Sequence, residues 1–164
     1  SGFVSSDFHV HGIRSADSRV SDVHRVQSYS AEGVENVIMT DHHVHTDLRP
    51  AIADAGLDHL LTATIGEEIT SFDYGHFNAY PMLIDPDSPH ATYSADGSTQ
   101  LSGGSTDWAQ AAPPGQDFPA YGALNATPAE ILALATTGPL STPDTTIQIN
   151  HIGSHFQPLR IVHV

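Results

Sequence analysis

Strand-length apolar runs alternate with helical patterns along this 164-residue chain, and this alternation constrains the fold more than any other feature. Strands are expected at residues 4–10, 35–40, 60–65, 77–83 and 146–150. Helices are expected through Val20, Val23 and Val26 up to Gly33, over residues 48–55, and from the capping box Thr127-Pro128-Ala129-Glu130 to Gly138. Because such alternation implies parallel strands joined by crossover helices, the sequence predicts an α/β fold.

Histidine and glutamate residues stand at the ends of these predicted strands. The chain holds twelve histidines, and its strand ends carry His9, His11, His42, the pair Glu67-Glu68, and His151. In parallel α/β folds, ligands bind at the carboxyl ends of the strands. The sequence therefore predicts one functional site that is built from several strand ends.

His9 and His11 lie on one face of the first strand, because strand side chains alternate with period two. Two neutral imidazoles that point the same way can hold a metal ion, although a packed or exposed pair also explains an isolated His-x-His. Asp17 either joins them from the following loop or is a solvated loop residue. These residues are the first candidates for metal ligands.

His42 is the ligand expected from the histidine-rich segment after the second strand, with Asp41 as the acceptor that fixes its tautomer. Two neighbouring histidines are expected to line the same pocket: His43 and His45. Glu68 is the carboxylate expected to bridge two cations, although Glu67 and Glu68 also fit a solvated loop pair.

The charge balance excludes several classes of function. Five arginines and no lysine oppose 19 acidic residues, which gives a net charge of −14 with histidine neutral, and cysteine is absent. A chain this acidic lacks the basic surface that binds nucleic acids or anionic membranes, so neither is an expected partner. Thiol chemistry, disulfides and carbamylated-lysine bridges are excluded, and catalysis would depend on His, Asp, Glu, Arg and hydroxyl groups.

Residues 1–164 are expected to form one domain with an insertion at residues 85–126. The insertion is rich in Pro, Gly, Ser and Thr, which excludes long helices and central strands there. No apolar run approaches the roughly 20 residues that span a bilayer, and no signal peptide is recognised, so the compartment stays open.

The order of these motifs resembles the polymerase-and-histidinol-phosphatase (PHP) superfamily of metallohydrolases, and is most similar to its carbaryl-hydrolase-like branch. Five segments carry the resemblance: Asp7–His11, Thr40–His42, Gly66–Glu68, Gly75–Asn78 and Asn150–Gly153. It extends over residues 3–84 and 127–156. The later segments add His76 and His151 as candidate metal histidines.

The resemblance implies a distorted (β/α)7 TIM-like barrel that holds two or three divalent ions, which would be zinc, manganese or iron. It assigns His9 and His11 to the first ion with Glu68 bridging, His76 and His151 to the second, and Asp17 and His42 to a third. Two departures from the pattern matter, because no Asp-x-His motif follows His151 and the family's barrels are longer. We therefore expect an N-terminal portion of the catalytic domain, whose open sheet edge pairs with the missing remainder or with a second copy.

The expected function is a metal-dependent hydrolase that uses metal-activated hydroxide on a small phosphoester or a carboxylic or carbamate ester. Arg14 would hold a substrate phosphate or carboxylate unless it is a surface arginine, and His155 or His45 would act as general acid beside Glu68. A histidine-rich module that binds metal without catalysis would also explain the histidines and the acidity, but not the placement of the expected ligands at successive strand ends. A structural domain with a degenerate, metal-free site is the third interpretation.

Overall fold

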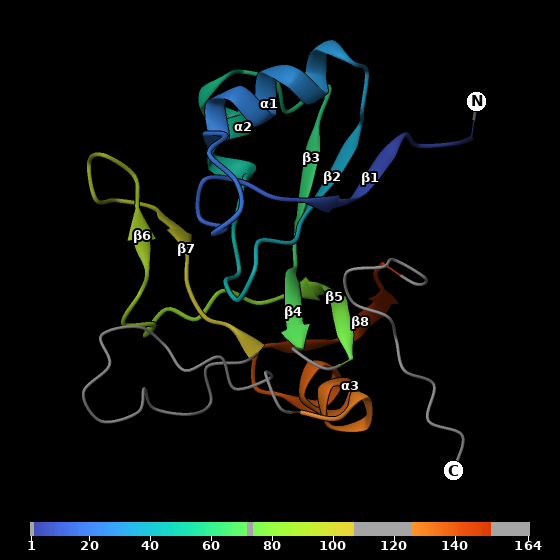
Figure 1. Ribbon diagram of the computed structural model, residues 1–164. Coiled ribbons are helices and arrows are strands. Elements are labelled where there is room, and N and C mark those ends of the chain that lie inside the picture. The colour runs from blue at the N-terminus through green and yellow to red at the C-terminus, as the bar shows by residue number, and fades with distance from the viewer. Residues whose placement is uncertain (1, 72–73, 107–125, 152–164) are drawn as a thin grey trace.

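The computed structural model describes residues 2–71, 74–106 and 126–151, and their strands form three separate sheets (Figure 1). The strands are β1 (Ser6–Val10), β2 (Asn36–Met39), β3 (Thr62–Ile65), β4 (Glu67–Ser71), β5 (Gly75–Met82), β6 (Thr92–Tyr93), β7 (Gln100–Ser102) and β8 (Ser141–Ile149). The helices are α1 (Asp22–Ala31), α2 (Arg49–Asp54) and α3 (Pro128–Thr137). The described residues contain no helix long and apolar enough to cross a membrane.

The first sheet has the order β1-β2-β3, and its strands are parallel and joined through α1 and α2. This part of the chain follows the predicted strand–helix alternation. Gly33 and Gly56 have positive φ angles of 74° and 68°, which glycine adopts without strain just after a helix. The sheet and its helices share one apolar core: Val10, Val26, Val37, Met39, Leu48, Ile52 and Leu61.

The second sheet has the order β4-β5-β8, and both of its strand pairs are antiparallel. The helix α3 packs against β8 at the bottom of Figure 1, and the predicted capping box between Thr127 and Glu130 is present at its start. A separate core lies between the second sheet and α3, and the last residue of β3 joins it: Ile65, Ile69, Phe77, Ala79, Met82, Ile131 and Ala135. The described residues thus form two apolar cores, one beside each of the two larger sheets.

The predicted barrel is wrong, because the described strands form sheets of two or three strands and none of these sheets closes. Its first three strands are parallel as expected, but β3 and β4 are separated by Gly66 alone, with no crossover helix between them. A Cβ atom at Gly66 would lie 2.8 Å from the carbonyl oxygen of Ala79 and 2.9 Å from that of Met39. Glycine therefore lets the chain pass directly from the first sheet into the second.

The predicted insertion at 85–126 contains the β6–β7 hairpin, and residues 107–125 lie outside the described part of the chain. Backbone hydrogen bonds fasten the hairpin to the segment after β2. His45 N donates to Gly104 O at 3.0 Å, and Gly103 N donates to His45 O at 3.0 Å. The end of β7 is thereby held beside the segment after β2 that carries His42.

Candidate metal centre

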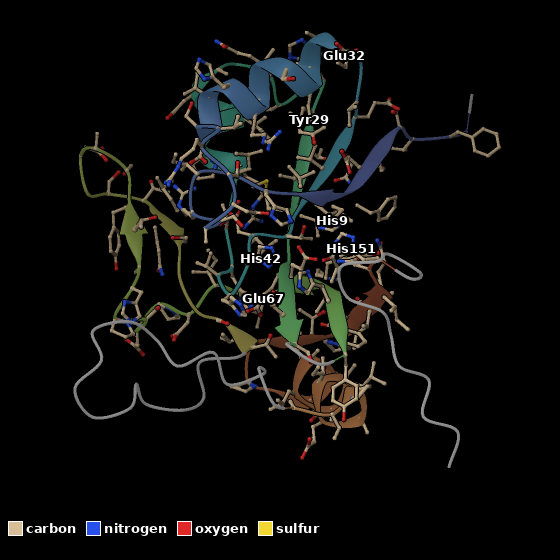
Figure 2. The ribbon with its side chains drawn as sticks, viewed as in Figure 1. His9, Tyr29, Glu32, His42, Glu67 and His151 are labelled. Atoms are coloured by element: carbon tan, nitrogen blue, oxygen red, sulfur yellow. The ribbon has the colours of Figure 1, made fainter. Side chains whose placement is uncertain are left out.

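The candidate ligands gather where the two larger sheets meet. His42, just after β2, forms an isolated parallel bridge with Glu68 on β4. Glu68 N donates to Asp41 O at 3.2 Å, so this bridge joins the parallel sheet to the antiparallel one. In Figure 2 the side chains of His9, His42 and His151 lie in the region between the two sheets.

Glu68 lies at the centre of this gathering, with a side chain only 1% exposed. Its carboxylate oxygens lie within 3.5 Å of nitrogen atoms from several imidazoles. The distances are 2.9 Å to His9 Nε2, 2.8 Å to His11 Nε2, 3.5 Å to His42 Nε2, 2.9 Å to His76 Nδ1 and 3.4 Å to His151 Nε2. Five imidazoles from four different strand regions thus face one buried carboxylate.

These imidazoles also form a closed circle. Neighbouring ring centroids are 4.9 Å apart for His9–His11, 4.8 Å for His11–His42, 5.1 Å for His42–His76, 5.3 Å for His76–His151 and 5.5 Å for His151–His9. The circle brings together all five histidines that the sequence nominated as metal ligands. His76 and His151 come from β5 and from the end of β8, which the sequence did not predict to be neighbours.

Hydrogen bonds between these side chains do not fully account for the arrangement. His9 Nε2 and His11 Nε2 lie 2.9 Å apart, and both lie within 2.9 Å of the same Glu68 oxygen. His76 Nε2 is buried and has no hydrogen-bond partner within the described part of the chain. Two ligands held about 2.05 Å from one tetrahedral ion would be about 3.3 Å apart, which is close to the observed separations.

Three groups of side chains have ligand atoms within 4.8 Å of one another and could each hold a metal ion. The groups are His9, Glu68 and His151; His11, Asp17 and His42; and His42, Glu68 and His76. Imidazole and carboxylate donors suit divalent ions such as zinc, iron and manganese. The grouping overlaps the one that the PHP resemblance implies, but it pairs His9 with His151 and His11 with Asp17.

Electrostatics within the cluster favour an ionised carboxylate. Burial raises the pKa of Glu68, but hydrogen bonds with His11 and His76 outweigh it and hold the pKa well below its usual range. Burial lowers the pKa of His11, yet its hydrogen bonds with Glu68 and Asp17 raise that pKa to about 9. For His42, burial dominates and lowers the pKa to about 4.

Metal binding at pH 7 is expected to release the proton of His11, because an imidazole must be neutral to bind a metal and the pKa of His11 is about 9 without one. His42, with a pKa of about 4, is already neutral and contributes no proton. Apparent affinity should therefore rise with pH up to about 9. Titration calorimetry in buffers of different ionisation enthalpy measures the release, and its persistence in His11→Gln would contradict this assignment.

Several polar residues that the sequence analysis missed hold the cluster in place. Thr70 Oγ1 lies 2.7 Å from His42 Nδ1, and Ser15 Oγ donates to Asp17 at 2.6 Å. Asn150 donates to Glu68 Oε1 at 3.0 Å and to Asn78 at 2.6 Å. Thr70 lies two residues after Glu68, so on a strand both side chains share one face. This spacing is the sequence signal that could have predicted the contact between Thr70 and His42.

Three residues near the site have contacts other than those expected. Asp41 accepts hydrogen bonds from Gly12 N and Thr46 Oγ1 and does not fix the tautomer of His42. His45 is buried against Glu67, with Nε2 at 2.9 Å from Oε2, and does not line the pocket. Glu67 faces away from the imidazole circle and is not among the candidate ligands.

Arg14, the predicted substrate-binding arginine, is engaged elsewhere. Its guanidinium donates two hydrogen bonds of 2.9 Å to Asp22 and a third to Thr92. These contacts tie the loop after β1 to the start of α1 and to β6. Its position matches a structural arginine, whereas His155 lies outside the described residues.

The cluster opens into a cavity of about 690 Å³. Its lining residues are His9, His11, Asp17, Ser18, Arg19, Val20, Arg25, His42, Glu68, His76 and His151. This volume lies in the range of small-molecule sites. No family model, no curated protein and no solved structure matches this chain.

Proposed function

We propose that this chain is a metal-dependent hydrolase that acts on a small phosphoester or a carboxylic or carbamate ester. The observation that carries the proposal is the closed circle of five imidazoles around the buried Glu68 carboxylate. The order of the PHP-like motifs, which led to the same residues, also supports it. We propose two or three ions of zinc, manganese or iron, since Glu68 belongs to two of the three candidate groups.

Divalent ions held in this cluster would lower the pKa of a water molecule to near neutrality and would polarise the oxygen of the bond to be cleaved. The chain's own residues create the conditions for this chemistry. Glu68 supplies the negative charge at the centre, while Thr70 and Asn150 orient His42 and Glu68. All five histidines of the circle line the cavity, so a substrate bound there would lie against the cluster.

The test combines metal analysis with a hydrolysis screen. The purified chain is loaded separately with zinc, manganese and ferrous iron, and each form is offered p-nitrophenyl phosphate, p-nitrophenyl acetate and an aryl N-methylcarbamate. We expect two or three ions per chain and turnover of at least one substrate that is abolished by a chelator and restored by metal. Stoichiometric metal without turnover of any ester would instead favour a metal-binding module, and absence of bound metal would exclude both functions.

A further inference from the structure

The arginines of the chain fall into two groups by what they contact. Arg14 and Arg49 are each paired with a carboxylate, Asp22 and Asp47 respectively. Arg19 and Arg25 line the metal cavity, and neither lies within ion-pair distance of a carboxylate in residues 2–71, 74–106 or 126–151. In a chain of net charge −14, two cations without acidic partners at one cavity point to an anionic ligand there.

Arg25 is fixed in place by one end of its guanidinium group. Its Nε donates to the carbonyl oxygen of His11 at 2.7 Å, which ties the arginine of α1 to the strand end that carries two candidate ligands. The Nη atoms make no hydrogen bond to any described residue, so they keep their four N–H groups for a ligand. Arg19 is exposed on the loop before α1, and its side chain makes no hydrogen bond to any residue that the structure describes.

The cavity therefore has two chemically different walls. The imidazoles and Glu68, which come from strand ends, form the wall where the reacting group would bind. Arg19, Val20 and Arg25 come from one continuous segment and form the other. Two carboxylates lie in or beside that segment, and both have other partners: Asp22 pairs with Arg14, and Asp17 contacts Ser15 and His11.

We propose that Arg19 and Arg25 form an anion subsite that selects esters whose non-reacting part carries a carboxylate or a phosphate group. This inference rests on the proposed hydrolase function and assigns its substrate class. A guanidinium group binds both kinds of oxyanion through paired N–H donors, which an uncharged ester cannot match. A cavity of about 690 Å³ accommodates a substrate larger than the reacting group alone.

The test compares two esters with the same leaving group and similar length, p-nitrophenyl hydrogen succinate and p-nitrophenyl butyrate, on the zinc-loaded chain. A third ester with a terminal phosphate in place of the carboxylate separates the two anion sources. We expect kcat/KM to favour an anionic ester by about tenfold or more, since charge-assisted hydrogen bonds of this kind have that strength. Arg19→Gln and Arg25→Gln should each remove most of the preference. Arg49→Gln loses the same charge on α2, outside this cavity, and should keep the preference.

The outcomes separate this inference from the proposed function. Chelator-sensitive hydrolysis of all three esters at equal efficiency would overturn the anion subsite and leave the hydrolase standing. If no ester is hydrolysed, calorimetric titration of glutarate and of inorganic phosphate into the loaded chain decides the subsite by binding alone. Weakening of about tenfold in Arg19→Gln and Arg25→Gln, but not in Arg49→Gln, would support it, and equal affinities in all variants would overturn it.

Discussion

Replacing Glu68 by glutamine should reduce metal affinity by at least about 100-fold and abolish chelator-sensitive hydrolysis. Loss of a residue that merely supports a ligand costs about 10–100-fold in affinity, and Glu68 belongs to two of the three candidate metal groups. The glutamine amide would also place N–H donors or a neutral oxygen among five imidazoles that face a negatively charged carboxylate in the unsubstituted chain. Metal content by elemental analysis and kcat/KM measure the two effects.

Glu32→Gln is the matched control for this change. Glu32 is an exposed glutamate at the end of α1, which Figure 2 places away from the imidazole circle. The control makes the same change in charge and should leave metal content and turnover as they are. Full metal occupancy in Glu68→Gln would show that the ions bind elsewhere and that the central carboxylate has another purpose.

The second large effect is expected at Glu67 and His45, both fully buried. His45 Nδ1 lies 2.6 Å from the carbonyl oxygen of Leu83, and Nε2 lies 2.9 Å from Glu67. Both ring nitrogens therefore face acceptors, which favours the protonated, positively charged imidazole. Burial raises the pKa of Glu67, but the charge of His45 outweighs it and lowers that pKa. Ser105 Oγ and Thr106 N also donate to this carboxylate.

Glu67→Gln should lower the free energy of unfolding by about 3–5 kcal/mol, because it leaves the buried imidazolium without its counter-charge. For a domain of this size, such a loss corresponds to a fall in Tm of about 10 °C. Thermal unfolding followed by circular dichroism measures it, with Glu32→Gln again as control. The folded fraction should still bind metal, since Glu67 is not a candidate ligand. A double-mutant cycle with His45→Gln isolates the pair, and a coupling energy near zero would contradict this account.

The sequence predicted which histidines come together better than it predicted the fold. His9, His11 and His42 follow from strand periodicity at the ends of β1 and β2, and these strands are parallel as expected. The strands near His76 and His151 were recognised, but the direction of their pairing was not. Apolar runs of strand length have the same pattern in parallel and antiparallel sheets, and β4 was not predicted as a strand at all.

Glu67 and Glu68 show a further limit of pattern reading. Period two places neighbouring strand residues on opposite faces, so only one of the pair can face the imidazoles. Both faces of β4 are buried here, and both glutamates are fully or almost fully inaccessible. Hydrophobic alternation identifies the buried face of a strand only where the other face is exposed to water. The sequence pattern therefore could not show that His45 contacts Glu67 on the second buried face of β4.

The imidazole circle draws its members from both halves of the molecule, which have separate apolar cores. His9, His11 and His42 belong to the parallel half, whereas Glu68, His76 and His151 belong to the antiparallel half. Ions shared between these ligands would act as cross-links between the two cores. The cooperativity of unfolding would then depend on metal concentration, and the chain would fold as one unit only to the extent that the centre is filled.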